Sequence, residues 1–238
     1  MKNTNKQGAR EMRGARGVRG ARGAQRSRVS RVPRMIYRDD FIKTGKKSAL
    51  ANQYVNDTLI KLGFSPLSGS ELKYRPGKWN NNPNIKHSHN CYAYAMGKIR
   101  SGLSSKPQPG YFADYPGLRE EDYKCEVFYN RMKKDNPTIE QIEFNKPCRQ
   151  GSHKIYLALD TKPNDRDYHY YRHDSSGYWS GKAGRTDVND VDASGEKIIN
   201  PNKADRSYQW YQYKQPCGFY CVNPNFSRAH AKSRQNRD

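Results

Sequence analysis

The first 38 residues of this chain are rich in arginine and glycine and offer nothing that a hydrophobic core could bury. They hold twelve lysines or arginines and one acid, Glu11, and the six-residue pattern that starts at Arg13 is repeated from Arg19. Glycine at every third position raises the entropy of the backbone, so this arm is predicted to be disordered. Any folded domain must therefore come from the rest of the chain.

The charge of the arm predicts a polyanionic partner. The whole chain has a net charge of +21, and the arm alone supplies +11 of it. Arginines spaced in this way can follow phosphates and stack on bases without reading sequence. The residues expected to bind nucleic acid or another polyanion are Arg10, Arg13, Arg16, Arg19, Arg22, Arg26, Arg28, Arg31 and Arg34. A solubilising tail is the alternative.

Residues 39–226 are predicted to form one compact α+β domain, followed by a short basic tail at 227–238. Helical spacing is found over Lys47–Leu62, from Asn90 to near Gly102, and over Glu120–Lys134, while Pro66 to Asn82 reads as a long loop. Strands are expected at Lys154–Asp160, Asp167–His173, Gly177–Ser180 and Gly218–Val222. Helices first and antiparallel strands after them predict an α+β fold. The eighteen tyrosines suit a small, aromatic core.

Cysteine number and the ends of the chain suggest a location. Five cysteines are an odd number, and no apolar leader or run of eighteen apolar residues is found. The expectation is an intracellular, reducing compartment with five free thiols, and no membrane partner. No cofactor is expected. The positions of His87, His89 and Cys91 match no common zinc pattern, and Cys217 and Cys221 lack a second pair, so no metal site is predicted.

Cys91 and His169 are the candidate catalytic residues. A cysteine at the start of a helix meets unpaired N–H groups that favour its thiolate, and a histidine on a downstream strand is a candidate base. The alternative is that both side chains simply pack, since free cysteine is among the most buried residue types.

Five segments together resemble an uncharacterised family of bacterial and giant-virus proteins, itself similar to the NlpC/P60-like branch of papain-fold cysteine hydrolases. They are Asn90–Ala95, Gln108–Gly110, Asp167–Arg172, Asp174–Ser180 and Asp192–Gly195. The resemblance covers a core of about 85–222. It implies a papain-like fold of N-terminal helices packed on an antiparallel sheet, with Cys91 as nucleophile, His169 as base and a peptide or amide as substrate.

The resemblance implies a residue that orients His169, and this chain lacks that residue. Related sequences carry a histidine where this chain has Gly181, and a base without an orienting partner loses orders of magnitude in rate. Candidate substitutes are Ser180, Asp187, Asn189 and Asp192. The sequence therefore predicts a thiol hydrolase with a polyanion-binding arm. The alternative is a degenerate, non-enzymatic structural protein associated with nucleic acid, for example in a giant-virus virion.

Overall fold

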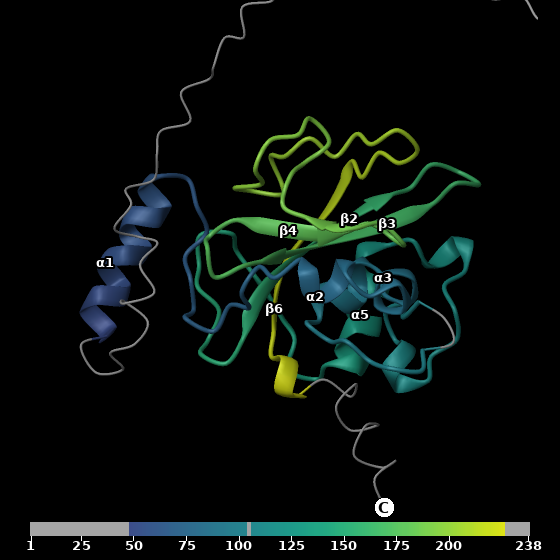
Figure 1. The fold of residues 1–238 in the computed structure, drawn as a ribbon, viewed down its shortest axis with the longest axis horizontal. Coiled ribbons are helices and arrows are strands. Elements are labelled where there is room, and N and C mark those ends of the chain that lie inside the picture. Colours follow the sequence, from purple (N-terminus) through teal and green to yellow (C-terminus); the bar gives the residue numbers. More distant parts are fainter. Residues whose placement is uncertain (1–47, 104–105, 227–238) are drawn as a thin grey trace, which may run out of the picture. The chain divides into compact units, whose positions relative to one another are not determined.

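The structure is a computed structural model that describes residues 48–103 and 106–226 (Figure 1). The predictions made for the arginine–glycine arm and for the tail at 227–238 lie outside the described residues. None of the described helices is long and apolar enough to cross a membrane.

One antiparallel sheet of six strands organises the described part of the chain. The strands are β1 (Glu140–Ile142), β2 (His153–Asp160), β3 (Asp167–His173), β4 (Trp179–Lys182), β5 (Val188–Asn189) and β6 (Gln215–Val222). Their order is β1-β6-β2-β3-β4-β5, so that β6, the last strand, lies between β1 and β2. Every residue of β2 is buried. This strand is therefore sandwiched on both faces, which explains its nearly continuous apolar sequence.

A hairpin joins β3 to β4 through a tight turn at residues 174–177. Gly177 donates its N–H to the carbonyl of Asp174 at 2.9 Å, and Asp174 N–H bonds to the carbonyl of Tyr178 at 2.9 Å. This turn sets the register in which His173 faces Trp179 and Tyr171 faces Gly181. The turn residues thus determine which side chains of β4 lie beside those of β3.

The helices are short. They are α1 (Ser48–Lys61), α2 (Gly77–Asn80), α3 (Pro83–Ser88), α4 (Cys91–Ala95) and α5 (Cys125–Asp135), with 3-10 turns at Tyr111–Ala113, Glu120–Asp122 and Pro224–Phe226. The α+β prediction is confirmed. The long loop predicted from Pro66 to Asn82 is wrong in part, because α2 lies within it and α3 begins at Pro83. The helix predicted from Asn90 to near Gly102 stops at Ala95.

Two hydrophobic clusters lie on opposite faces of the sheet. The face covered by α4 and α5, here called the helix face, carries Ile155, Leu157, Leu159, Tyr168 and Tyr170. The other, the loop face, is covered by the segment between β5 and β6 and carries Tyr156, Ala158, Tyr171, Trp179 and Phe219. Alternation along β2 and β3 divides the side chains between the two cores.

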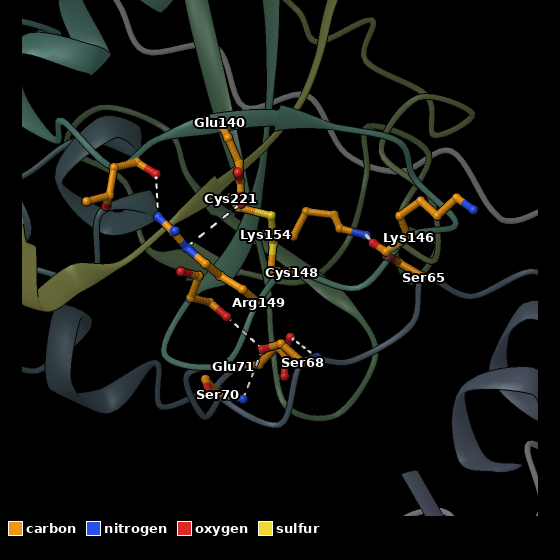
Figure 2. The surroundings of a disulfide bond; sticks show 12 residues. Ser65, Ser68, Ser70, Glu71, Glu140, Lys146, Cys148, Arg149, Lys154 and Cys221 are labelled. Carbon is orange, nitrogen blue, oxygen red and sulfur yellow. Dashed lines mark hydrogen bonds and ion pairs between the residues drawn. A yellow bond between two sulfur atoms is a disulfide. The ribbon is translucent and has the colours of Figure 1, made fainter. Parts of the chain in front are cut away.

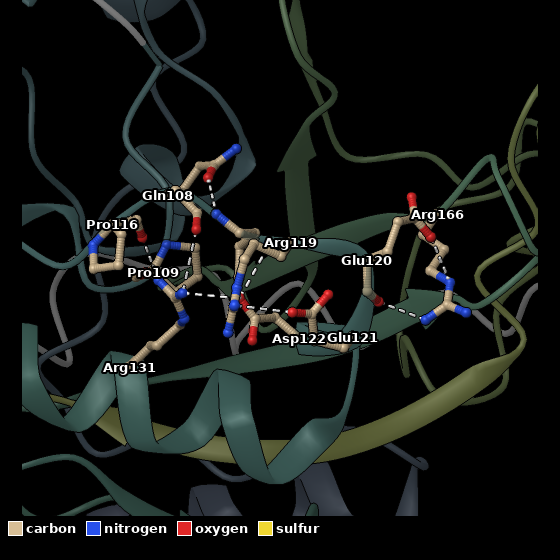
Figure 3. A network of polar contacts seen from close by, with 11 residues as sticks. Gln108, Pro109, Pro116, Arg119, Glu120, Glu121, Asp122, Arg131 and Arg166 are labelled. Carbon is tan, nitrogen blue, oxygen red and sulfur yellow. Dashed lines mark hydrogen bonds and ion pairs between the residues drawn. The ribbon is translucent and has the colours of Figure 1, made fainter.

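A buried arginine fixes the loop between α4 and α5 (Figure 3). The guanidinium of Arg131, on α5, donates to the carbonyls of Pro109 at 3.3 Å and Pro116 at 2.7 Å. It also pairs with Asp122 at 3.0 Å. The hydrogen bond that Arg119 N–H donates to the Asp122 carboxylate at 3.0 Å, and after it the positive charge of Arg131, hold the pKa of Asp122 below its usual value. One side chain therefore ties three points of an irregular segment to α5.

Candidate functional site

Cys91 is the first residue of α4, and its neighbour Asn90 caps that helix. The Asn90 side chain accepts a hydrogen bond from Ala93 N–H at 3.1 Å, as an N-cap residue does. Its amide also donates to the carbonyl of Pro107 at 2.7 Å. The prediction that a helix begins at Asn90 is confirmed.

The Cys91 thiol is buried against the helix face of β3. The residue is 4% exposed, and its Sγ lies 3.7 Å from the carbonyl oxygen of Tyr168, to which it donates. Burial, and after it the negative charge of Asp167, raises the pKa of the thiol to about 12. This is opposite to the direction that a nucleophile requires, because the thiolate is the reactive form.

His169 is buried on the loop face. Its ring packs against Tyr171 and Tyr213, with centroids 4.6 Å and 5.3 Å apart, and is 6.4 Å from the ring of Tyr208. Burial lowers the pKa of His169 to about 4. The ring is therefore neutral near pH 7 and lies in an aromatic cage.

The strand register separates the two predicted catalytic residues. Tyr168 and Tyr170, which flank His169, pair with Leu159 and Leu157 and belong to the same cluster as Cys91. His169 instead pairs with Ala158, which belongs to the opposite cluster. Within the described residues no hydrogen bond joins Cys91 to His169. The structure thus brings Cys91 to the strand that carries His169, but to its other face.

Gly181 lies directly against the His169 ring, at the position where the resemblance implies an orienting residue. A Cβ atom built on Gly181 would be 2.7 Å from His169 Nε2, which is closer than non-bonded atoms allow. The glycine leaves the space that the imidazole fills. A side chain at this position would have to displace the ring.

The four candidate orienting residues have other contacts. Ser180 lies on the helix face, where it pairs in register with Arg172 and bonds to Tyr94 Oη at 2.6 Å and to Asp174. Asp187 forms an exposed ion pair with Lys86 at 2.6 Å. Asn189, in β5, pairs with Gly181 of β4. Asp192 accepts hydrogen bonds from the backbone of Ser194, Glu196 and Asp205, which organise its own loop.

A buried polar network beside α4 was not predicted from the sequence. Arg172 and Asp174 are 3% and 1% exposed, and their side chains pair at 2.7 Å. Arg172 also donates to Tyr94 Oη at 2.7 Å, and its guanidinium carbon lies 4.0 Å from the centre of that ring. The sequence signal was a charged residue inside an otherwise buried strand, followed two positions later by a carboxylate.

Tyr92 and Gly110 belong to a second network of this kind. Asp135 on α5 accepts hydrogen bonds from Tyr92 Oη at 2.6 Å and from Gly110 N–H at 2.8 Å. Burial raises the pKa of Asp135 to about 6. Gly110 has a φ of +92°, a conformation that other residues avoid. Tyr92 and Gly110, which lie in the segments that resemble the hydrolase family, therefore hold α4, α5 and the turn between them together.

Four of the five cysteines form disulfides, which corrects the expectation of five free thiols. Cys148 is bonded to Cys221 (Figure 2). Cys125 is bonded to Cys217, which leaves Cys91 as the free cysteine. The five cysteines thus comprise two disulfide-bonded pairs and one unpaired residue. Cys217 and Cys221 lie on one strand but bond to different partners, α5 and the segment before β2. Both disulfides therefore anchor β6, a central strand.

Two buried positions of the sheet hold lysine side chains. Lys154 Nζ, near the Cys148–Cys221 disulfide, donates to Ser65 Oγ at 2.6 Å and to the carbonyls of Phe144 and Lys146 at 2.8 and 2.5 Å (Figure 2). Burial lowers the pKa of Lys154 to about 7. Lys182 Nζ likewise donates to three backbone carbonyls.

Among the described residues, no group of three or more His, Cys, Asp or Glu side chains is arranged to hold a metal ion.

Comparison with known proteins gives one curated relative. This chain is similar to insoluble matrix shell protein 1 of Ruditapes philippinarum, with 32% identity over 152 residues that cover 64% of this chain and 90% of the relative. The chain belongs to the family of that protein. No family model and no solved structure matches the chain. Because 90% of the relative is covered, the likeness extends over most of that protein and beyond a single motif.

Proposed function

We propose that this chain is a non-catalytic structural protein, in which a disulfide-bonded α+β domain carries an arm that binds polyanions. The observation that supports this most strongly is the position of Cys91 and His169. They are buried on opposite faces of the sheet, with a thiol pKa near 12 and an imidazole pKa near 4. A protonated thiol and a neutral ring on two faces have no route for proton exchange between them.

The roles of the resembling segments support the same proposal. Asn90 caps α4, Tyr92 and Gly110 bind Asp135, and Arg172 pairs with Asp174. Each of these contacts stabilises the domain without a substrate. These contacts support the view that the resembling residues maintain the fold, a role that they would keep whether or not the site is active.

The relative's name and the disulfides support a proposal about the environment in which this chain functions. The relative's name describes an insoluble protein of a shell matrix. Two disulfides that close long loops are typical of proteins in oxidising compartments. We therefore propose that this chain is a component of an insoluble assembly in an oxidising environment, in place of the reducing compartment expected from the cysteine number.

Binding of a polyanion is assigned to the nine arginines between Arg10 and Arg34. Nucleic acid and an acidic polymer share the chemistry that these side chains recognise. The test replaces all nine by glutamine in the full-length chain and measures binding to DNA and to heparin at several salt concentrations. Binding should weaken, and the slope of log K against log salt should become shallower, because fewer counterions are released. An unchanged slope would remove the arm from the proposal.

The papain-like hydrolase is the second candidate function. It is favoured by Cys91 at the capped start of α4, whereas Gly181, where the resemblance implies an orienting residue, disfavours it. Activity would require a rearrangement that brings the His169 ring around to the thiol. Incubation of the full-length protein with a peptide library, with Cys91→Ala as the control, tests it. Cleavage that depends on Cys91 would replace the structural proposal.

A further inference from the structure

An open cavity lies at the end of the sheet where β2 finishes. Its volume is about 500 Å³, within the range of roughly 300–1,000 Å³ typical of small-ligand sites. It is lined by the end of β2, the turn after it and the segment that leads into β6, and its lining residues include Asp160, Lys162, Trp210 and Lys214. The Asp160 carboxylate joins these walls, since it accepts Lys162 N–H at 3.1 Å and Gln212 N–H at 2.6 Å.

Trp210 provides an exposed aromatic surface at this cavity. The residue is 73% exposed, whereas the other two tryptophans, Trp79 and Trp179, are 5% and 0% exposed. Tryptophan buries a large area when it is covered, and its flat face suits the apolar face of a ring. An indole left open beside a cavity is the feature that marks a binding site here.

Amide side chains surround the indole. Gln209 and Gln212 are exposed, and their side chains form no hydrogen bond with any residue in the described ranges. Gln215 Nε2 has only a long contact of 3.7 Å, to Cys125 Sγ. Each amide presents both donors and an acceptor, which matches hydroxyl groups that also donate and accept.

The charged side chains that line the cavity are Lys162 and Lys214 against Asp160, a net charge of +1. Lys162 is 3.6 Å from Asp165 in an exposed ion pair of the kind that contributes little, and Lys214 forms no ion pair within the described part of the chain. The carboxylate of Asp160 is occupied by two backbone N–H groups. Both ammonium groups are therefore available to a negatively charged group on the ligand.

We propose that the Trp210 cavity binds an acidic polysaccharide, with a sugar ring stacked on the indole, hydroxyls bound by the glutamine amides and an acidic group facing Lys162 and Lys214. This extends the structural function proposed above by naming a ligand for the folded domain. A single-stranded nucleic acid fits less well. Sites for it use several aromatic side chains for successive bases, whereas this cavity has one such platform and no arginine.

Tryptophan fluorescence of the full-length protein tests the proposal, because Trp210 is the exposed indole and the arm contains no tryptophan. Oligogalacturonate, a uronic acid oligomer, should produce a saturable change in emission and protect the fluorescence from quenching by acrylamide. In calorimetric titration, Trp210→Ala should weaken binding by about tenfold, and Lys214→Gln should weaken it mainly at low salt. The matched control is Tyr54→Ala, which removes an equally exposed ring on α1 and should leave binding unchanged.

Three results would overturn the inference. They are no protection of Trp210 by oligogalacturonate, equal protection by neutral malto-oligosaccharide, and stronger protection by the single-stranded DNA poly(dT). Binding of oligogalacturonate that leaves Trp210 fully quenchable would assign the polymer to the arm. That result would support the proposed structural function while rejecting this site.

Discussion

Removal of the Cys148–Cys221 disulfide should destabilise the domain by about 4 kcal/mol. The two cysteines are separated by 73 residues, and closing a loop of that length lowers the entropy of the unfolded chain by about 15 cal/mol/K, or about 4.4 kcal/mol at 25 °C. The variant that carries both Cys148→Ala and Cys221→Ala avoids leaving a lone thiol. For a domain of this size the loss corresponds to a decrease in Tm of about 10–15 °C.

Urea denaturation followed by circular dichroism measures this loss in free energy of unfolding. Cys91→Ala is the matched control, because it removes a buried cysteine that has no disulfide and should cost only about 1 kcal/mol. The reasoning is refuted if the double variant is no less stable than the control. It is equally refuted if peptide mapping of the unreduced protein finds other pairings.

Three further predictions concern buried groups. Burial lowers the pKa of His153 and His169 to about 4 and that of His173 to about 3, so the unfolded chain takes up their protons first and stability falls as pH decreases from about 6.5 to 4. The free energy of unfolding should decrease by up to about 4 kcal/mol per pH unit, less the opposing effect of the buried carboxyls whose pKa is raised. Urea titrations at pH 7, 6 and 5 that coincide would disprove this prediction. Gly181→Ala should cost about 1–3 kcal/mol by overpacking against the imidazole, and thermal denaturation should show no loss if that contact is absent. Arg172→Leu should cost about 3–5 kcal/mol, because it leaves a buried carboxylate unpaired, and a loss under 1 kcal/mol would contradict the pairing.

Most of the central strands could be predicted from the sequence. Asp167–His173 was predicted with the bounds of β3, because its aromatic residues and the Asp174–Gly177 turn are strong local signals. The two edge strands were missed for physical reasons. Glu140–Ile142 is short and polar and takes its conformation from pairing with β6, and β5 has only two residues. Such strands follow from tertiary pairing and carry little local propensity.

The candidate site shows where sequence reasoning ends. The start of a helix at Asn90 was predicted, because its signals are local. The sequence does not determine the face of β3 on which α4 packs. Tyr168 and His169 are adjacent in sequence and point to opposite sides, so a pattern of alternating aromatic residues is compatible with either face. The disulfides were equally hidden, since Cys125 and Cys217 are 92 residues apart and meet only through the sheet topology.

Alkylation of Cys91 in the native, full-length protein tests the central claim most directly. Mass spectrometry after iodoacetamide treatment without reductant gives the number of free thiols and the rate at which each is labelled. The structural account predicts one reactive cysteine in urea, Cys91, slow labelling of it in the native state near pH 7, and no change in that rate with His169→Ala. Native labelling of Cys91 that is faster than in the unfolded chain, and that His169→Ala abolishes, would show a thiolate activated by His169 and contradict the account.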